Sequence, residues 1–265
     1  MSKMDFDQLC ALREIERARM KLGLPGFHDD IQTLVDRYKD GASALKSNNP
    51  RLIQAKVLWD KGVGQNVIIG FDSSVPGLDG FGEFNENVPG YPVWAKSFEE
   101  YLATIPEIPE ALLADDPNLP LLRLVDPRAG LVKTCELFGI LFKEFSYSDE
   151  DVVAFDTRHE IPNTPFWVRA HDGRKNRNCK PNVCRDECKD KLYAMTAMVA
   201  IMIWVQDPSI IKENEHVLDC PGSMHRADRG FCAYLYVWNS EVNLYLRRIA
   251  DAAVPHCGSG GFRRE

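Results

Sequence analysis

The stretch FCAYLYVWNSEVNLYLRRIA, residues 231–250, carries the strongest secondary-structure signal in the chain and decides the expected fold. Aromatic and branched residues lie on both sides of Asn239-Ser240, a dipeptide suited to a two-residue hairpin turn. The first arm is apolar almost throughout, whereas residues 242–246 of the second arm alternate between apolar and polar. We therefore expect an antiparallel hairpin with a central first arm and a second arm nearer the sheet edge.

Strand and helix patterns alternate in the chain before this hairpin. The expected strands are LPLLRLVD at 119–126, DVVAFD at 151–156 and TPFWVRAHD at 164–172. A short helix capped by Asp207 is expected before the hairpin. Two longer helices are also expected: one over 130–145, with Cys135 and Phe142 on its apolar face, and one from the cysteine-rich stretch at 178–188 through the apolar run at 192–205. These patterns predict an α+β fold: a C-terminal mixed β-sheet, built on LLRLVD, FWVRA and the terminal hairpin, covered by these two helices.

The N-terminal half predicts a helical region with one or two strands. Helices are expected at 6–15, at 29–41 and from Asn49 to Gly62, followed by a buried strand at 66–72, a Gly- and Pro-rich loop, and a short helix capped by Ser97 with Glu100. Prolines at 106, 109, 117 and 120 indicate a linker. We therefore place a domain boundary near residue 117, which separates an N-terminal region, 1–117, from a C-terminal α+β domain, 118–265.

Composition limits the classes of partner. The 265 residues include 39 acidic and 32 basic ones, for a net charge of −7, and the mean hydropathy is −0.29. This balance disfavours phosphate-backbone binding over the whole surface. The longest apolar run, 192–205, is too short to cross a bilayer, which takes about 20 residues. The N-terminus lacks the pattern of an export signal, so we expect a cytoplasmic protein with no membrane partner.

Three cysteines fall within NCKPNVCRDEC, residues 178–188. Cys184 and Cys188 are one helical turn apart, and Cys179, with His171 from the preceding strand, would complete a tetrahedral set that suits a structural zinc ion. The spacing is not the paired form of zinc ribbons, and it favours packing of Cys184 and Cys188 as small apolar residues over metal binding. A redox role, favoured by the basic neighbours of these cysteines, is the third interpretation.

Two further cysteines raise the alternative of a cysteine-dependent enzyme. Cys257 follows His256 in the Gly-rich tail, and Cys220 lies in the chain before His225. The histidine partner of a catalytic cysteine normally comes from a distant segment, so His159 and His216 are also candidates. We expect a docked or loosely held tail rather than an active site at Cys257.

Basic residues cluster in RAHDGRKNRNCK, residues 169–180, and recur at Arg247, Arg248, Arg263 and Arg264. If these segments meet, they form an anion or nucleic-acid surface on which Trp167 or Trp238 stacks bases. A solvated loop is the alternative, and the acidic balance of the chain favours it.

From about residue 119 onward, the chain resembles a large group of bacterial proteins of unknown function that are frequent in small-genome candidate phyla. The resemblance is carried by four short segments: LPLLRLVDPRAGL at 119–131, FWVRAHDG at 166–173, HVLDCPGS at 216–223, and the Trp-containing hairpin followed by PHCGSGGFRRE at 255–265. The matching positions are Leu218, Asp219, Cys220, Gly222, Ser223, Trp238, Gly258, Ser259 and Arg263. Met224 and the Gly-Ser-Gly-Gly order of the tail depart from the pattern. The resemblance implies an architecture and a bacterial source, and it implies no reaction.

The sequence therefore favours a non-catalytic binding or interaction module. The main reason is that no nucleophile with its base, no acid-base pair and no cofactor fingerprint is evident. A cysteine-dependent enzyme, a thiol redox protein or a structural zinc protein is the alternative, and zinc is the only cofactor that the pattern suggests. A protein partner fits the first hypothesis.

Overall fold

The structure is a computed structural model that describes residues 49–72, 77–78, 84–85, 90–142, 150–188, 192–248 and 253–264. By their contacts, the residues divide into two units, Met1–Lys56 and Val57–Glu265. The helices expected at 6–15 and 29–41 lie outside the described residues. Residue 117, where the sequence predicts a domain boundary, lies inside the second unit.

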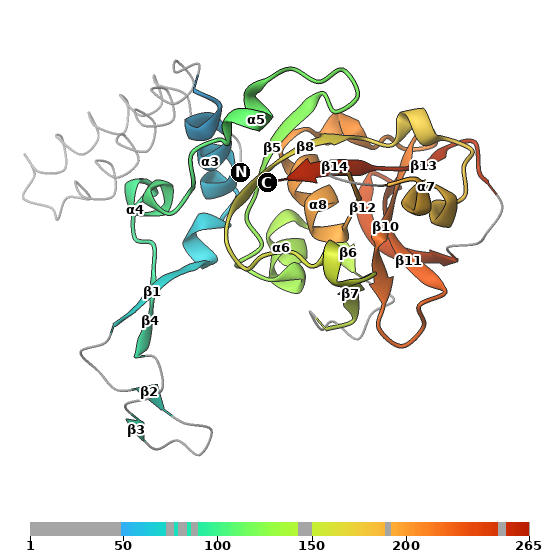
Figure 1. The fold of residues 1–265 in the computed structure, drawn as a ribbon. Helices are drawn as coiled ribbons and strands as arrows, with labels where there is room; N and C mark the ends of the chain where they lie inside the picture. Colours follow the sequence, from blue (N-terminus) through green and yellow to red (C-terminus); the bar gives the residue numbers. More distant parts are fainter. Residues whose placement is uncertain are drawn as a thin grey trace, which may run out of the picture. The chain divides into compact units, whose positions relative to one another are not determined.

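The second unit has the predicted α+β class, and its C-terminal part is built on two sheets (Figure 1). The smaller sheet is antiparallel and has the order β5 (Leu121–Val125), β8 (Phe166–His171), β14 (Gly261–Arg264) and β9 (Tyr193–Ala194). The larger sheet has the order β13 (Cys257–Ser259), β10 (Val217–His225), β11 (Phe231–Trp238), β12 (Glu241–Arg248) and β6 (Leu141–Phe142), and β7 (Val152–Ala154) also pairs with β10.

The terminal hairpin forms as predicted, with β11 between β10 and β12. Asn239 and Ser240 both have positive φ, 51° and 62°, as a type I′ turn requires. The larger sheet is mixed because β13 is parallel to β10 and β6 is parallel to β12. The expectation of a single sheet is wrong, since LLRLVD and FWVRA pair with each other in the smaller sheet.

Helix α8 (Ala197–Gln206) contacts β5 of one sheet and β10 and β11 of the other. Thr196 begins it by accepting a hydrogen bond from the backbone N–H of Val199. The predicted continuous helix from the cysteine-rich stretch is wrong, because α7 (Pro181–Glu187) is a separate helix and β9 pairs with β14 between the two. The apolar run is therefore a strand followed by a shorter helix.

Helix α6 (Leu131–Phe138) is also shorter than predicted. Gly139 adopts a left-handed conformation with φ of 66°, and its N–H bonds back to the last turn, which ends the helix. Phe142, expected on the apolar face of this helix, instead lies in β6 beside β12. Cys135 is buried, as predicted from its place on the helix.

Before β5, the chain forms short elements. They are α3 (Pro50–Asp60), η1 (Gly64–Asn66), β1 (Ile68–Asp72), β2 (Gly77–Leu78), β3 (Phe84–Asn85), β4 (Tyr91–Trp94), α4 (Phe98–Ala103) and α5 (Glu110–Leu113). The helix expected from Asn49 and the cap at Ser97 are confirmed. The expectation that strand β1 is buried is wrong: among the described strands it pairs with β4 alone, and Phe71 is 54% exposed.

The proline-rich segment expected as a linker is bound to β8. Trp167 donates its indole N–H to the carbonyl of Pro106 at 2.9 Å. The buried guanidinium of Arg169 donates to the carbonyls of Leu112 at 2.7 Å and Leu113 at 3.2 Å. Because these carbonyls satisfy a buried charge, the segment packs as part of the second unit.

The remaining helical turns are η2 (Thr157–His159), η3 (Arg174–Asn176) and η4 (Pro208–Ile210), and Asp207 caps the last of these as predicted. No helix in the described ranges has the length and hydrophobicity needed to cross a bilayer.

The Gly-rich tail passes from one sheet to the other, since β13 belongs to the larger sheet and β14 to the smaller one. Its backbone approaches η3 so closely that a Cβ on Gly258 would lie 2.2 Å from the carbonyl oxygen of Gly173. A Cβ on Gly260 would lie 2.7 Å from Met195 and 2.9 Å from Leu218. The glycines are therefore required for packing, and the tail is docked.

We predict that Gly258→Ala lowers the free energy of unfolding by about 1–3 kcal/mol, because the obstructing atom is a backbone oxygen that cannot rotate away. Gly70→Ala is the matched control, since no heavy atom lies within 4 Å of its added Cβ. Urea unfolding of both variants gives the comparison. Equal stability of the two variants would contradict the close approach.

Candidate functional site

Of the four residues predicted as zinc ligands, His171 lies on β8, Cys179 in the loop before α7, Cys184 on α7 and Cys188 just after it. The thiol of Cys188 donates to the backbone carbonyl of Cys184 at 3.3 Å, so it points back into the helix turn. On β8, His171 accepts the N–H of Gly173 at its Nδ1, at 3.1 Å. Within the described ranges, which include all four residues, no three His, Cys, Asp or Glu side chains are grouped to hold a metal ion. The zinc site at His171, Cys179, Cys184 and Cys188 stays a prediction that this geometry does not support.

The cysteines are free thiols in the described ranges, and Cys179 is the exposed one. Burial raises the pKa of both the Cys184 and the Cys257 thiols to about 11. It raises the pKa of Cys220 and Cys232 still further. The thiolate is the nucleophile in cysteine chemistry, so these residues are poorly suited to attack a substrate or a disulfide at neutral pH.

Alkylation with iodoacetamide followed by peptide mass mapping tests this pattern. Among the described cysteines, we expect Cys179 to be modified first in the folded protein, and Cys220, Cys232 and Cys257 only after unfolding in urea. Rapid modification of Cys220 or Cys257 in the folded protein would favour the cysteine-dependent enzyme instead.

Two buried histidines are held by hydrogen bonds within the fold. His216 accepts from Arg177 Nε at Nδ1, at 3.2 Å, and its Nε2 lies 2.7 Å from the carbonyl oxygen of Asp172. Burial lowers the pKa of His171 to about 4, with a smaller effect from the Lys175 charge. Both residues are therefore neutral structural groups at physiological pH.

The low pKa of His171 predicts acid sensitivity. Below pH 6.5, the usual pKa of histidine, His171 binds a proton in the unfolded chain, whereas in the folded chain it binds one only near pH 4. The free energy of unfolding therefore decreases as the pH is lowered through this range. His171→Asn keeps an acceptor for the Gly173 N–H and removes the titration. Between pH 7 and pH 5, urea unfolding should show the wild type losing about 1–2 kcal/mol more than the variant. Equal losses would contradict the prediction.

The basic cluster expected to bind an anion is used within the fold. Arg169 is buried against the α5 segment, Arg174 pairs with Asp172, and Arg177 bonds His216. Trp167 is 2% exposed, so the expectation that it stacks bases is wrong. Trp238 is 58% exposed and is available for contact.

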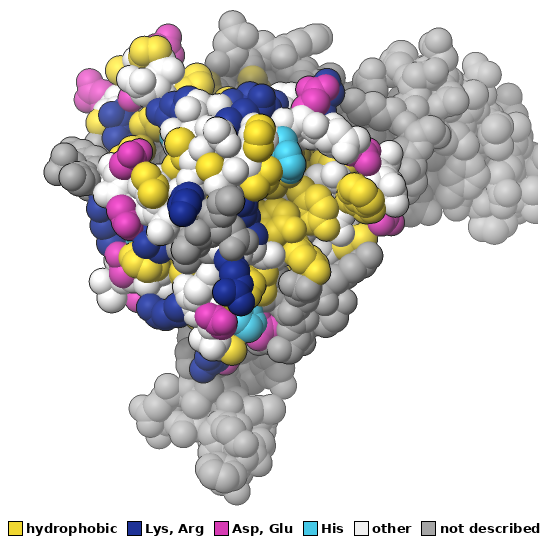
Figure 2. Space-filling view, turned by 90° about the vertical axis from the view of Figure 1, so that its right-hand side faces the viewer, with side chains coloured by type: hydrophobic (Ala, Val, Ile, Leu, Met, Phe, Trp, Pro, Cys, Tyr) yellow, Lys and Arg dark blue, Asp and Glu magenta, His cyan; other side chains and the backbone are white. Residues whose placement is uncertain are grey.

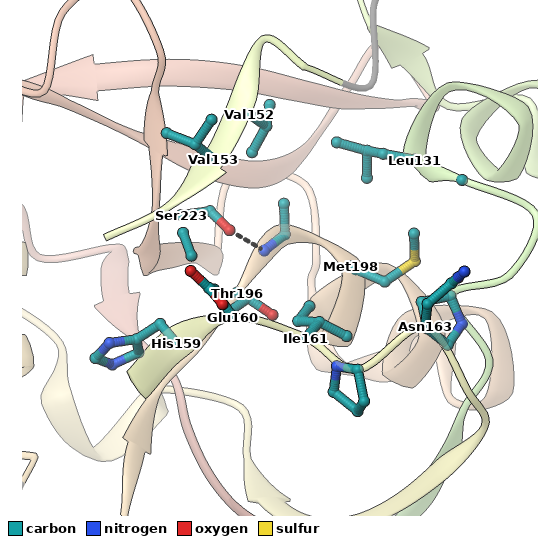
Figure 3. A pocket seen from close by; sticks show the side chains of 15 residues that line it. Leu131, Val152, Val153, His159, Glu160, Ile161, Asn163, Thr196, Met198 and Ser223 are labelled. Atoms are coloured by element: carbon teal, nitrogen blue, oxygen red, sulfur yellow. Dashed lines mark hydrogen bonds between the residues drawn. The ribbon is translucent and has the colours of Figure 1, made fainter. Parts of the chain in front are cut away.

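A cavity with a volume of about 410 Å³ lies beside the first turn of α8 (Figure 3). Its walls come from the starts of α6 and α8, from β7, from β10, and from residues 159–163 after η2. Figure 3 shows Glu160, Thr196 and Ser223 together on one side, opposite Leu131 and Met198. Val153 lies next to Ser223 and Asn163 lies next to Met198, so the lining is mixed, and we call the group of Glu160, Thr196 and Ser223 the polar end of the cavity.

Two hydroxyl groups at the polar end fix the start of α8. Ser223 Oγ accepts the N–H of Ala197 at 2.9 Å, and Thr196 Oγ1 accepts that of Val199 at 3.4 Å. Ser223 reaches this position because its strand pairs with β7, where it lies opposite Ala154. Ser223 and Thr196 are 5% and 1% exposed, so these two hydroxyl groups are held rigidly and shielded from bulk water.

His159 borders this cavity and, with Asp156 and Ser223, suggests a catalytic triad. His159 Nδ1 lies 2.6 Å from Asp156 Oδ1, but its Nε2 accepts the backbone N–H of Ala194 at 3.2 Å. Because Ala194 can only donate, the proton is on Nδ1 and the Nε2 lone pair is used. The imidazole thus has no lone pair for the Ser223 hydroxyl, and the three residues do not form a hydrolytic triad.

Charge at the polar end comes from Glu160, and no lysine or arginine is among the described residues that line the cavity. Asn163 adds a neutral amide, and the helix N-terminus adds backbone N–H groups that Ser223 and Thr196 partly satisfy. The lining therefore offers one full negative charge, several neutral hydrogen-bonding groups and an apolar wall.

Sequence reasoning missed this cavity, although it contained partial signals. Ser223 belongs to a segment that carries the resemblance, and Thr196, a residue type favoured at helix N-caps, interrupts the apolar run at 192–205. His159 and Glu160 follow a strand without any motif. Nothing local indicates that these segments meet at one end of α8.

Searches of protein families, of curated proteins and of solved structures found no match to the chain. The geometry of the described residues is therefore the basis for a functional proposal.

Proposed function

We propose that the protein is a non-catalytic binding protein whose ligand is a small, mainly apolar molecule that carries an amine. The observation that carries the proposal is the cavity of about 410 Å³ beside α8, with an apolar wall opposite Glu160, Thr196 and Ser223. Its volume and its mixture of apolar walls with a few fixed polar groups are typical of small-molecule sites.

The charges of the lining favour a cation. The N-terminus of α8 carries about half a positive charge, and it is already partly satisfied by Ser223 and Thr196. Glu160 carries a full negative charge, and the cavity has no basic lining residue among those described. The carboxylate outweighs the helix end, so an ammonium group is preferred to a carboxylate of the same shape.

Two observations support binding over catalysis. His159 has both ring nitrogens engaged, so the cavity lacks a general base next to Ser223. The cysteines that would serve a thiol enzyme are buried with raised pKa values, and they do not line this cavity. A role in binding a protein partner stays a prediction.

The proposal is tested with three molecules of one skeleton: 3-phenylpropylamine, 3-phenylpropanol and 3-phenylpropanoate. We expect calorimetry to show saturable 1:1 binding of the amine, weaker binding of the alcohol and the weakest binding of the carboxylate. Glu160 is exposed at the cavity mouth, so its ion pair contributes about 0.5–1 kcal/mol, or roughly a two- to five-fold change in Kd.

Glu160→Gln should reduce amine binding by this factor and leave the alcohol unchanged. Glu99→Gln, an exposed glutamate on α4, is the matched control and should leave both unchanged. The proposal fails if the amine does not bind saturably, or if the two variants affect it equally.

A further inference from the structure

The larger sheet turns a polar and aromatic face away from α8. Along β11, Ala233 and Leu235 are fully buried, whereas Tyr234 and Tyr236 are partly exposed, and Trp238 is 58% exposed. Successive side chains of a strand point to opposite faces, so the three aromatic residues share the face opposite the apolar core. The rings of Tyr234 and Tyr236 are adjacent, with 5.1 Å between their centroids.

A second cavity, of about 340 Å³, opens on this face. Tyr234, Tyr236 and Trp238 of β11 line it, together with Arg247 of β12 and with His256 and Cys257 at the start of the tail. Aromatic side chains present flat apolar faces, and a planar ring can stack on such a face. The volume suits a molecule of one or two rings.

Arg247 gives this cavity its charge. Its guanidinium, 11% exposed, lies with Nη1 3.3 Å from each carboxylate oxygen of Asp219, and Asp219 is fully buried behind it. Burial raises the pKa of Asp219 to about 6 even with Arg247 beside it, and of this ion pair only Arg247 is among the residues that line the cavity. No Asp or Glu is among the described residues that line the cavity, so a ligand meets the positive group.

The surroundings of this region agree with an aromatic and basic site. Strands β11 and β13 lie on the right of Figure 1, the side that faces the viewer in Figure 2. There, hydrophobic side chains form a patch bordered by lysine or arginine side chains and by a histidine (Figure 2).

We propose that this cavity is a second binding site, for a planar aromatic molecule that carries an anionic group. The ring stacks on Trp238 and Tyr236, and the anion lies against the guanidinium of Arg247. The site is distinct from the cavity beside α8: its lining residues are different, and the charge that it offers to a ligand is opposite.

The test compares 2-naphthoate with its neutral amide, 2-naphthamide, by calorimetry on the full chain at neutral pH. We expect saturable 1:1 binding of the naphthoate and at least five-fold weaker binding of the amide, because the amide loses the charge-assisted contact. AMP and adenosine form a second pair, and they distinguish a phosphate on a nucleobase from a carboxylate on a simple ring. Tighter binding of the anion than of its neutral partner in either pair supports the site. If neither pair shows this preference, the site is overturned.

Variants locate the binding. Trp238→Ala should weaken binding of the preferred anion at least five-fold, whereas Trp94→Ala, which removes a comparably exposed tryptophan from β4, should leave it unchanged. Thermal unfolding of both variants confirms that they fold. Equal effects of the two substitutions would overturn the site.

Arg247→Gln gives a second readout that does not depend on Trp238. It should remove the preference for the anion while the neutral partner keeps its affinity. If this variant does not fold because Asp219 loses its partner, the two tryptophan variants still decide the outcome.

Discussion

The fold depends on the burial of α8, a helix that has no polar face. Eight of its ten residues are buried, including Ile201, Met202 and Ile203, which have no exposed surface. A helix that is apolar on all sides needs apolar cover on all sides, and one sheet can cover only one side of it. The chain supplies two: β5 contacts the helix from the smaller sheet, and β10 and β11 contact it from the larger one. Each fully buried Ile or Met side chain contributes about 1.5–3 kcal/mol to this arrangement.

Both candidate sites follow from this enclosure. The cavity with Glu160 lies at the first turn of α8, where the helix begins and its backbone N–H groups need acceptors. Ser223 and Thr196 supply two acceptors, and they also form the polar end of the cavity. On β10, the pleat that points Leu218 into the core must point Asp219 to the opposite face, where it meets Arg247. The aromatic cavity is thus the outer side of the sheet that covers the helix.

Sequence patterns predicted those features that depend on neighbours along the chain. The hairpin at Asn239-Ser240 and the caps at Ser97 and Asp207 follow from side chains within a few residues. The extent of α6 was wrong because the left-handed turn at Gly139 outweighed the apolar period that continues to Phe142.

Features that depend on distant segments were not predictable in this way. The continuous helix through 178–205 was wrong because Tyr193 and Ala194 pair with the C-terminal strand β14. The same holds for the cavity beside α8, since Glu160, Thr196 and Ser223 come from three separate segments. The cysteine-rich stretch attracted attention by its local spacing, yet Cys188 uses its thiol within its own helix turn. A cluster of chemically reactive residues in the sequence was therefore a poorer guide to a site than the pairing of segments that are distant in the chain.

The charge of the whole chain, −7, says little about what these cavities select. At physiological ionic strength, charges more than about 8 Å apart on the surface are largely screened, so a ligand in a cavity responds to the groups that line it. Glu160 makes one lining negative, and Arg247 makes the other positive. Arg247 also remains charged at all accessible pH values, because a guanidinium does not deprotonate in proteins. An acidic protein can therefore hold a site for an anion, and the composition argument against extended phosphate-backbone binding does not apply at the scale of one cavity.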